Sequence, residues 1–289
     1  MAIYSIKDLE LLTGIKAHTI RMWERRYRIV DPSRTQTNIR EYSDEDLKKL
    51  LNISILNNCG MKISMLAKMS FEELTSTVTE VVEKHKSPGL LSEQLVIAMI
   101  NYDERALTKI INDSIDTNGF NFALDKIIFP FLNKLGMMWQ VGKIIPANEH
   151  FASSIIRKKI LHETAILGPN IGELPKHILF LPEGEYHEIV LLSLNYLAKS
   201  KGINTLYLGQ SVPLADIIAV GKQLHPNFFI FSATLPQPHK LDQILKELST
   251  TFPLTTIIGG GPALDEIKRK PKAFAKLTSF DDFQTIITQ

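Results

Sequence analysis

The chain contains the stretch His177-Ile178-Leu179-Phe180-Leu181-Pro182-Glu183-Gly184-Glu185-Tyr186-His187, a short apolar run followed by a turn. The run has the length of a buried strand, and residues 188–200 after the turn have the apolar spacing of a helix. His187 therefore stands at the carboxyl end of the first strand, where α/β sheets hold their ligands. The stretch predicts an α/β domain with a ligand site at this turn.

The same alternation of strand and helix continues to the end of the chain. Further strands are expected at Thr205–Leu208, Phe228–Phe231, Thr256–Ile258 and near Lys276–Phe280. The helices between them are expected at Leu214–Gln223, Leu241–Ser249 and Leu264–Lys268. Such alternation is typical of parallel βαβ units. We therefore predict a flavodoxin-like (Rossmann-like) parallel α/β domain over residues 177–289.

The residues before this domain show helical periodicity instead. Apolar side chains recur at three- and four-residue spacing in the stretches Leu91–Asn101, Asp103–Asp116, Phe122–Met138 and Ala147–Leu161. Four helices with short joints favour a four-helix bundle. We predict this bundle over residues 90–167, preceded by a helical linker over residues 71–89.

Residues 1–70 combine short helices with a concentration of arginine. Thr13-Gly14 ends the first helix, and Ala17–Tyr27 forms the second. Residues 21–40 hold six arginines against two acidic residues. A helix, a tight turn and a basic second helix predict a helix-turn-helix with its recognition helix. Trp23, on that second helix, is interpreted as a core residue.

Composition narrows the class of protein. A chain of 289 residues suits two or three domains. It holds no run of 18 apolar residues, and its first residues lack the pattern of a signal peptide. Cys59 is the single cysteine, which excludes an internal disulfide and a thiolate metal cluster. We expect a soluble cytoplasmic protein with no membrane partner.

The segment Arg21-Met22-Trp23-Glu24-Arg25-Arg26-Tyr27, followed by a basic stretch over residues 34–42, resembles the MerR-type DNA-binding domain. The resemblance implies a winged helix-turn-helix that binds double-stranded operator DNA, with residues 34–42 as the wing. Phosphate contacts position a duplex and base contacts read it, and His18 and Thr19 are the candidates for reading. The alternative is a solvated basic helix face. The predicted DNA-binding residues are His18, Thr19, Arg21, Arg25, Arg26, Tyr27, Arg34, Arg40 and Tyr42.

The C-terminal motifs Glu185-Tyr186-His187, Ser232-Ala233-Thr234 and Gly259-Gly260 resemble, in type and spacing, the cobalamin (vitamin B12)-binding domain of corrinoid proteins. The resemblance implies that His187 is the lower axial ligand of the cobalt and that Glu185 orients its ring. It also implies that Ser232 and Thr234 bond the displaced base of the nucleotide tail, which would pass Gly259 and Gly260. The alternative is that His187 is a residue at the start of a helix with no metal.

One position departs from the family pattern. Val190 stands where the family has glycine. A branched side chain at the start of this helix is expected to narrow the slot for the nucleotide tail.

In the bundle, Trp139 and the pair Glu149-His150 resemble the helical cap of B12-dependent MerR regulators. The resemblance implies that these residues face the upper axial side of the cobalt. Trp139 would shield an adenosyl group, and Glu149 would bond its ribose hydroxyls. The alternative is that Trp139 and His150 are plain core residues. Gln140 stands where some light-sensing relatives have a histidine.

Together the motifs resemble the CarH/LitR/CarA-like family of photoreceptor repressors. The resemblance implies a transcriptional repressor, not an enzyme, that binds adenosylcobalamin, or methylcobalamin as the second choice. It implies a homo-oligomer, dimer or tetramer, whose operator binding responds to the cofactor and to light. One alternative is a cofactor-independent MerR-type regulator whose degenerate B12 domain recruits a protein antirepressor. Another is a component of a corrinoid methyltransferase or mutase.

Overall fold

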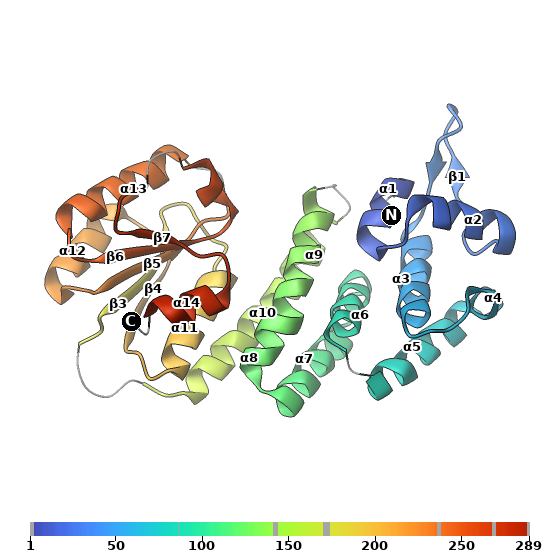
Figure 1. Ribbon diagram of the computed structural model, residues 1–289, viewed down its shortest axis with the longest axis horizontal. Helices are drawn as coiled ribbons and strands as arrows, with labels where there is room; N and C mark the ends of the chain where they lie inside the picture. Colours follow the sequence, from blue (N-terminus) through green and yellow to red (C-terminus); the bar gives the residue numbers. More distant parts are fainter. Residues whose placement is uncertain are drawn as a thin grey trace. The chain divides into compact units, whose positions relative to one another are not determined.

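The computed structural model describes residues 3–85, 87–140, 144–169, 174–235, 238–267 and 270–287, with the backbone alone described at residues 82–85, 140 and 238. The chain forms two compact units, Met1–Ile155 and Ile156–Gln289, which are considered in turn (Figure 1). Every helix within the described ranges is too short or too polar to span a membrane.

The first unit begins with a winged helix-turn-helix. Serine side chains cap the first and third helices in reciprocal capping boxes, Ser5 with Asp8 and Ser43 with Asp46. Gly14, with φ of 73°, makes the tight turn between the first two helices. The predicted wing contains an antiparallel strand pair, with Ser33 opposite Glu41 and Arg34 opposite Arg40. The elements are α1 (Ile6–Thr13), α2 (Ala17–Tyr27), β1 (Ser33–Arg34), β2 (Arg40–Glu41), α3 (Asp44–Asn58), α4 (Ile63–Leu66) and α5 (Phe71–His85).

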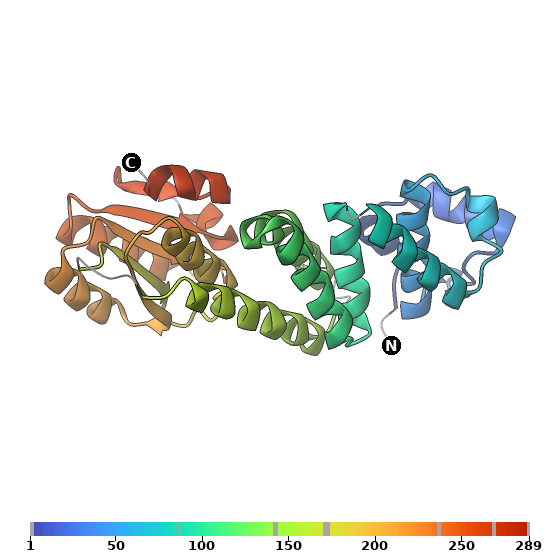
Figure 2. The same ribbon diagram turned by 90° about the horizontal axis from the view of Figure 1, so that it is seen from below.

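Helices of the predicted bundle follow, and the helix Pro88–Ile100 packs against both Glu104–Asn118 and Phe129–Gln140 (Figure 2). The sequence predicts one regular helix over Phe122–Met138, but the structure inserts a π-helical turn, η1, at Leu124–Ile128. The turn buries Leu124, Ile127 and Ile128, and the N–H of Phe129 bonds the carbonyl of Leu124 five residues before it, which is the spacing of a π-helix. The elements are α6 (Pro88–Ile100), α7 (Glu104–Asn118), α8 (Phe120–Ala123), η1, α9 (Phe129–Gln140) and α10 (Pro146–Ile166).

The second unit is a parallel sheet in the order β4-β3-β5-β6-β7, which confirms the flavodoxin-like prediction. Helices α12 and α13 cover one face of the sheet, and α11 and α14 cover the other (Figure 1). The strands are β3 (His177–Pro182), β4 (Thr205–Val212), β5 (Phe228–Ser232), β6 (Thr256–Gly260) and β7 (Phe274–Lys276). The helices are α11 (Ile189–Ser200), α12 (Leu214–Leu224), α13 (Pro238–Thr251), the 3-10 turn η2 (Pro262–Glu266) and α14 (Phe280–Ile287).

Alternate side chains of the strands form the core. Phe180 stacks on Phe231 at 5.8 Å between ring centroids, and Phe229 packs against Phe252 of the segment after α13 at 5.1 Å. These side chains pack with α12 and α13, while the residues between them, such as Leu179 and Ile230, point to the other face. Both faces of the central strands β3, β5 and β6 are therefore buried, so ligands can reach these strands only at their ends.

Three details of the second unit differ from the sequence prediction. The fifth strand ends at Lys276, and residues from Phe280 form the helix α14, because Phe283 and Ile287 lie one turn apart and are both buried. The helix predicted over Leu264–Lys268 is instead the 3-10 turn η2. Strand β4 runs four residues beyond its predicted end, to Val212, because it stays paired with Pro182 across two register shifts.

His177, at the start of β3, predicts a pH dependence of stability. Its ring is buried, stacks on Phe228 at 4.7 Å and has no described hydrogen-bond partner at either nitrogen. Burial lowers the pKa of His177 from 6.5 to about 4. The stability that the neutral ring contributes is therefore complete above pH 6.5 and is lost as the pH falls through 4. With solvent screening allowed for, we expect a loss of roughly 2 kcal/mol.

The measurement is urea unfolding of the second unit at pH 7 and pH 4.5. His177→Phe keeps the stacked ring and removes the titration, so it should lose less stability than the wild type between these values. His239→Gln, at an exposed position, is the control. Equal losses in wild type and His177→Phe would contradict the assignment.

Candidate functional site

The carboxyl ends of β3 and β5 meet at a single buried carboxylate, that of Glu185. Its Oε1 accepts hydrogen bonds from the backbone N–H groups of Tyr186 (3.0 Å) and His187 (2.9 Å). Its Oε2 accepts from the backbone N–H groups of Thr234 (2.7 Å) and Leu235 (3.0 Å). Glu185 thus joins the loop after β3 to the loop after β5, at the point where the strand order reverses.

Glu185 also holds the imidazole of His187. The distance between Oε1 and the ring Nδ1 is 2.6 Å, so the hydrogen bond expected from the sequence is present. Burial alone raises the pKa of Glu185, but the His187 side chain and the backbone N–H groups outweigh it and lower the pKa to about 2. In a neutral imidazole, an ionised carboxylate beside Nδ1 favours the proton on Nδ1, and this is the tautomer in which Nε2 carries the lone pair that can bind a metal.

Ser232, at the end of β5, is a second feature of this edge. Its side chain is 1% exposed, and its hydroxyl has no hydrogen-bond partner among the described residues. A buried hydroxyl in this state lacks a bond worth about 1–3 kcal/mol, which a ligand would supply. Thr234, two residues on, contributes its backbone N–H to Glu185, a role that the sequence prediction for its hydroxyl did not include.

The glycines of β6 have different surroundings. A Cβ on Gly259 would lie 2.8 Å from Phe274 and 2.9 Å from Leu264, so the protein's own core fills the space beside this residue. A Cβ on Gly260 would meet nothing closer than 3.7 Å, and Val190 Cγ1 would lie 3.8 Å away. Val190 therefore borders Gly260, whereas core side chains border Gly259.

Trp139, Glu149 and His150 belong to the first unit. Trp139 is 52% exposed, and the side chain of His150 is 76% exposed, with its Nδ1 2.7 Å from Glu149 Oε2. This exposure contradicts the alternative that Trp139 and His150 are plain core residues. The side chain of Gln140 lies outside the described residues.

The winged helix presents most of its predicted DNA-binding residues to solvent. His18, Arg21, Arg25, Arg26 and Arg34 are exposed, while Thr19, Tyr27 and Arg40 are partly buried. Arg26 lies over the ring of Tyr27, 5.2 Å from its centroid, and Arg34 donates to Asn38 at 2.7 Å. Trp23 is buried, which confirms its interpretation as a core residue.

Two wing residues have structural partners that the sequence analysis missed. Arg40 Nε lies 3.0 Å from both oxygens of Glu24, and the Tyr42 hydroxyl donates to Glu24 at 3.4 Å. Tyr42 is 1% exposed, and burial with the charge of Glu24 raises its pKa to about 12. The prediction that the hydroxyl of Tyr42 contacts DNA is therefore wrong in this structure, because that hydroxyl is buried against Glu24. Glu24 fastens the wing to the recognition helix.

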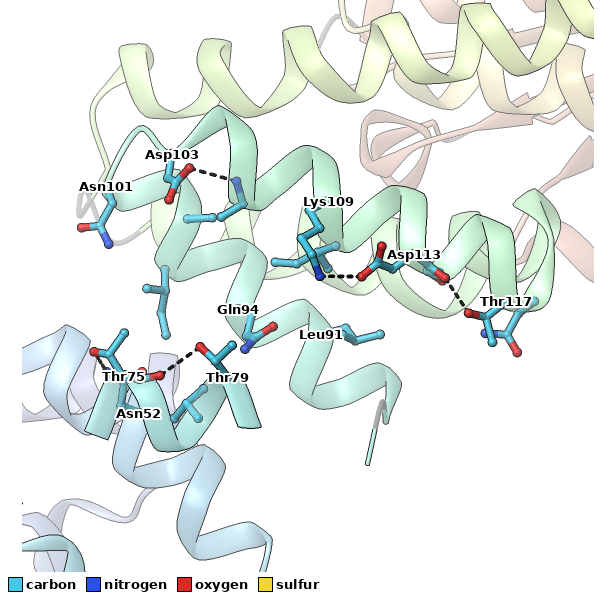
Figure 3. Close-up of a pocket in the computed structure, with 17 residues that line it drawn as sticks. Asn52, Thr75, Thr79, Leu91, Gln94, Asn101, Asp103, Lys109, Asp113 and Thr117 are labelled. Carbon is cyan, nitrogen blue, oxygen red and sulfur yellow. Dashed lines mark hydrogen bonds and ion pairs between the residues drawn. The ribbon is translucent and has the colours of Figure 1, made fainter. Parts of the chain in front are cut away.

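A cavity of about 310 Å³ lies elsewhere in the first unit, between α3 and α5 on one side and α6 and α7 on the other. Figure 3 shows its walls, where Asn52 donates to Thr75 at 3.3 Å and Lys109 pairs with Asp113 at 2.9 Å. The residues that line it include none of the predicted cofactor or DNA residues. No group of three or more metal-ligating side chains occurs within the described ranges.

Comparisons with known proteins match two separate parts of the chain. Residues 4–70 match the MerR HTH family regulatory protein family, and residues 91–162 match the B12 binding domain family. The chain is 26% identical over 269 residues to the HTH-type transcriptional repressor CarH of Myxococcus xanthus, covering 90% of this chain and 89% of CarH. It is 26% identical over 267 residues to the repressor CarA of the same organism, covering 91% of this chain and 88% of CarA.

Among solved structures, the monomethylamine corrinoid protein of Methanosarcina barkeri is similar in fold, with a TM-score of 0.56 at 14% identity. The match covers 67% of this chain and 94% of that protein. The two family matches identify the N-terminal domain and the helical bundle. The sheet order identifies the C-terminal domain as flavodoxin-like. The chain thus combines a domain that matches the MerR HTH family with a domain that matches the B12 binding domain family.

Proposed function

We propose that this protein is a transcriptional repressor whose oligomeric state and operator binding are controlled by cobalamin. The observation that carries the proposal is the buried Glu185 at the switch point of the sheet, which orients the imidazole of His187. A single oriented histidine is the one protein ligand that a corrin-bound cobalt requires, since the ring itself supplies the equatorial nitrogens.

The residues of the second unit fit a cobalamin bound with its own base displaced. His187 Nε2 would take the lower axial position of the cobalt. Ser232 would give the displaced base its hydroxyl, which bonds no other residue in the described ranges, with Thr234 beside it. Gly260 would let the tail pass close to the backbone. The exposed side chains of Tyr186, which precedes His187 in the chain, and of Leu235, whose N–H bonds Glu185, offer apolar surface for the corrin face to cover.

Residues of the first unit support the choice of adenosylcobalamin over methylcobalamin. Trp139 is a large exposed aromatic side chain, and Glu149 is held by His150. In the proposal, Trp139 shields the adenosyl group and Glu149 accepts from its ribose hydroxyls, with His150 fixing the carboxylate. Bound adenosylcobalamin would supply a cobalt–carbon bond that light breaks, so illumination is the proposed signal.

Control of DNA binding follows from linkage. A ligand shifts an equilibrium between oligomeric states only by binding one of them better. In the proposal, loaded protein forms the dimer or tetramer that presents two or more recognition helices to spaced half-sites. The relatives CarH and CarA are named repressors, which supports repression as the direction of control.

The test uses the full chain and adenosylcobalamin in the dark. We expect a coloured complex that survives gel filtration and elutes earlier than the free protein. Its affinity for a duplex from upstream of its own coding sequence should be at least about tenfold higher than that of the free protein, and illumination should remove the gain. A chromatogram without retained chromophore would refute the proposal.

The DNA-binding surface makes a separate prediction for Arg21→Ala. Each phosphate contact that is lost reduces the slope of log affinity against log salt by about 1. We therefore expect Arg21→Ala to weaken binding to a random-sequence duplex and to reduce the slope by about that amount. Lys201→Ala, which removes an exposed charge from the second unit, is the matched control. An unchanged slope in Arg21→Ala would argue against this surface.

Val190 favours a second candidate function, a cofactor-independent regulator whose B12 domain recruits a protein antirepressor. Its Cγ1 stands beside Gly260, where a tail would pass. If Val190 only narrows the slot, Val190→Gly should bind adenosylcobalamin about tenfold more tightly than wild type, a gain of about 1.4 kcal/mol. Ile189→Gly adds the same backbone freedom at the neighbouring position and should show no gain. Absence of binding in wild type and Val190→Gly alike would favour the second candidate.

A further inference from the structure

The residue after His187 is a buried carboxylate that is held from two sides. The side chain of Glu188 is 7% exposed, and its Oε1 pairs with the Nε of Arg157. Its Oε2 accepts a hydrogen bond of 3.0 Å from the hydroxyl of Tyr207 on β4. The carbonyl of Glu188 accepts the first backbone bond of α11, from Leu192 at 2.8 Å. Glu188 therefore fixes both the end of the His187 turn and the start of the next helix.

The buried charge of Glu188 requires both of its partners. Burial raises the pKa of Tyr207, and the adjacent charge of Glu188 raises it further, so the hydroxyl remains a donor. A buried carboxylate that loses its cation is left uncompensated, which is among the more destabilising changes in proteins. Without Arg157, the carboxylate of Glu188 would have to move toward water. Because His187 is the preceding residue in the chain, this movement would also displace His187.

Arg157 has a distinctive place in the sequence. It lies on α10, a continuous helix whose first part, Pro146–Ile155, belongs to the first unit and whose remainder belongs to the second. It stands seven residues after His150, about two turns along that helix. It also lies within residues 91–162, the range that matches the B12 binding domain family, whereas Glu188 and Tyr207 lie outside that range.

We infer that Arg157, Glu188 and Tyr207 form a clamp that positions His187 and ties its loop to α10. His187 is then held by Glu185 on its amino-terminal side and by the clamp on its carboxyl-terminal side. A change at the His187 turn, such as gain or loss of a ligand, would act on α10 through Arg157. The inference rests on the proposed function for the identity of that ligand, and Arg157 acts in it as a positioning residue.

The first measurement needs no cofactor. Backbone hydrogen exchange of residues 186–189 in the free full-length protein should be at least tenfold faster in Arg157→Gln than in wild type. Arg157→Lys keeps the charge and should recover most of the protection. Lys158→Gln removes a neighbouring exposed charge of the same helix and should leave the exchange unchanged. Wild-type exchange in Arg157→Gln would overturn the clamp.

The second measurement adds adenosylcobalamin in the dark. Wild type should gain protection in residues 186–189 and in α10 together, whereas Arg157→Gln should bind at least tenfold more weakly and gain no protection in α10. Equal protection of α10 in both would overturn the link to that helix. If Arg157→Gln fails to fold, Tyr207→Phe serves in its place, with a smaller increase in exchange of about threefold expected. Absence of binding in wild type would refute the proposed function, while the cofactor-free exchange would still decide the clamp.

Discussion

Replacing His187 with alanine is expected to weaken adenosylcobalamin binding by at least about 100-fold, because loss of a mere outer partner of a metal ligand already costs 10–100-fold. Glu185 would remain held by the backbone N–H groups of Thr234 and Leu235, so the loops should keep their fold. The loss would therefore concern the ligand and not the sheet. Equilibrium dialysis in the dark gives the affinity, and the absorption spectrum of any residual complex reports the missing nitrogen ligand.

The control for this substitution is His162→Ala, which removes an exposed histidine from α10 of the same unit. It should bind the cofactor with wild-type affinity. Thermal unfolding of the free variants should differ little, since the His187 side chain is half-exposed. A His187→Ala protein with wild-type affinity and an unchanged spectrum would show that His187 is not the lower ligand.

Gly261→Ala is expected to destabilise the second unit by about 3 kcal/mol. Gly261 follows β6 with φ of 101°, and an added Cβ would lie 2.3 Å from the carbonyl oxygen of Ala233. That oxygen is a backbone atom, and it also accepts from the N–H of Ala263 at 3.2 Å, so it cannot move aside cheaply. The overlap would push on the loop after β5, where Thr234 bonds Glu185.

Gly202→Ala separates the cost of backbone strain from the cost of steric overlap. Gly202 has φ of 75° but no atom within 4 Å of its added Cβ. It should cost only the backbone strain, about 1 kcal/mol. Urea unfolding followed by circular dichroism measures both variants. Equal losses at the two glycines would mean that the loop after β5 relaxes away from the overlap.

The fold could be predicted from the sequence wherever the spacing of apolar residues indicates the type of secondary structure. Strand–helix alternation after His177 predicts parallel units, and the structure has them. The sequence analysis placed a strand near Lys276–Phe280 and did not predict the helix α14, because the burial of Phe283 and Ile287 is visible only in the structure. The π turn at Leu124–Ile128 also escaped, since a one-residue change in helical period leaves the apolar pattern readable as an α-helix.

The contacts of the candidate sites could be predicted from the sequence only where the residues in contact are close together in the chain. Glu185 and His187 are two residues apart, and their hydrogen bond could be predicted from spacing. The bonds from Thr234 and Leu235 to Glu185 span about fifty residues, and only the strand order brings them together. The burial of Tyr42 against Glu24 depends in the same way on how the wing folds back.

The bonds of Glu185 and the isolation of Ser232 imply different evolutionary constraints. Glu185 holds two loops together whether or not a ligand is present, so selection for a stable fold alone would retain it. The buried hydroxyl of Ser232 has no hydrogen-bond partner among the residues that the structure describes, so none of them gives the fold a bond from it. A lineage that abandoned its cofactor should therefore keep Glu185 and drift at Ser232 toward alanine, which makes Ser232 the better marker of a working site among relatives.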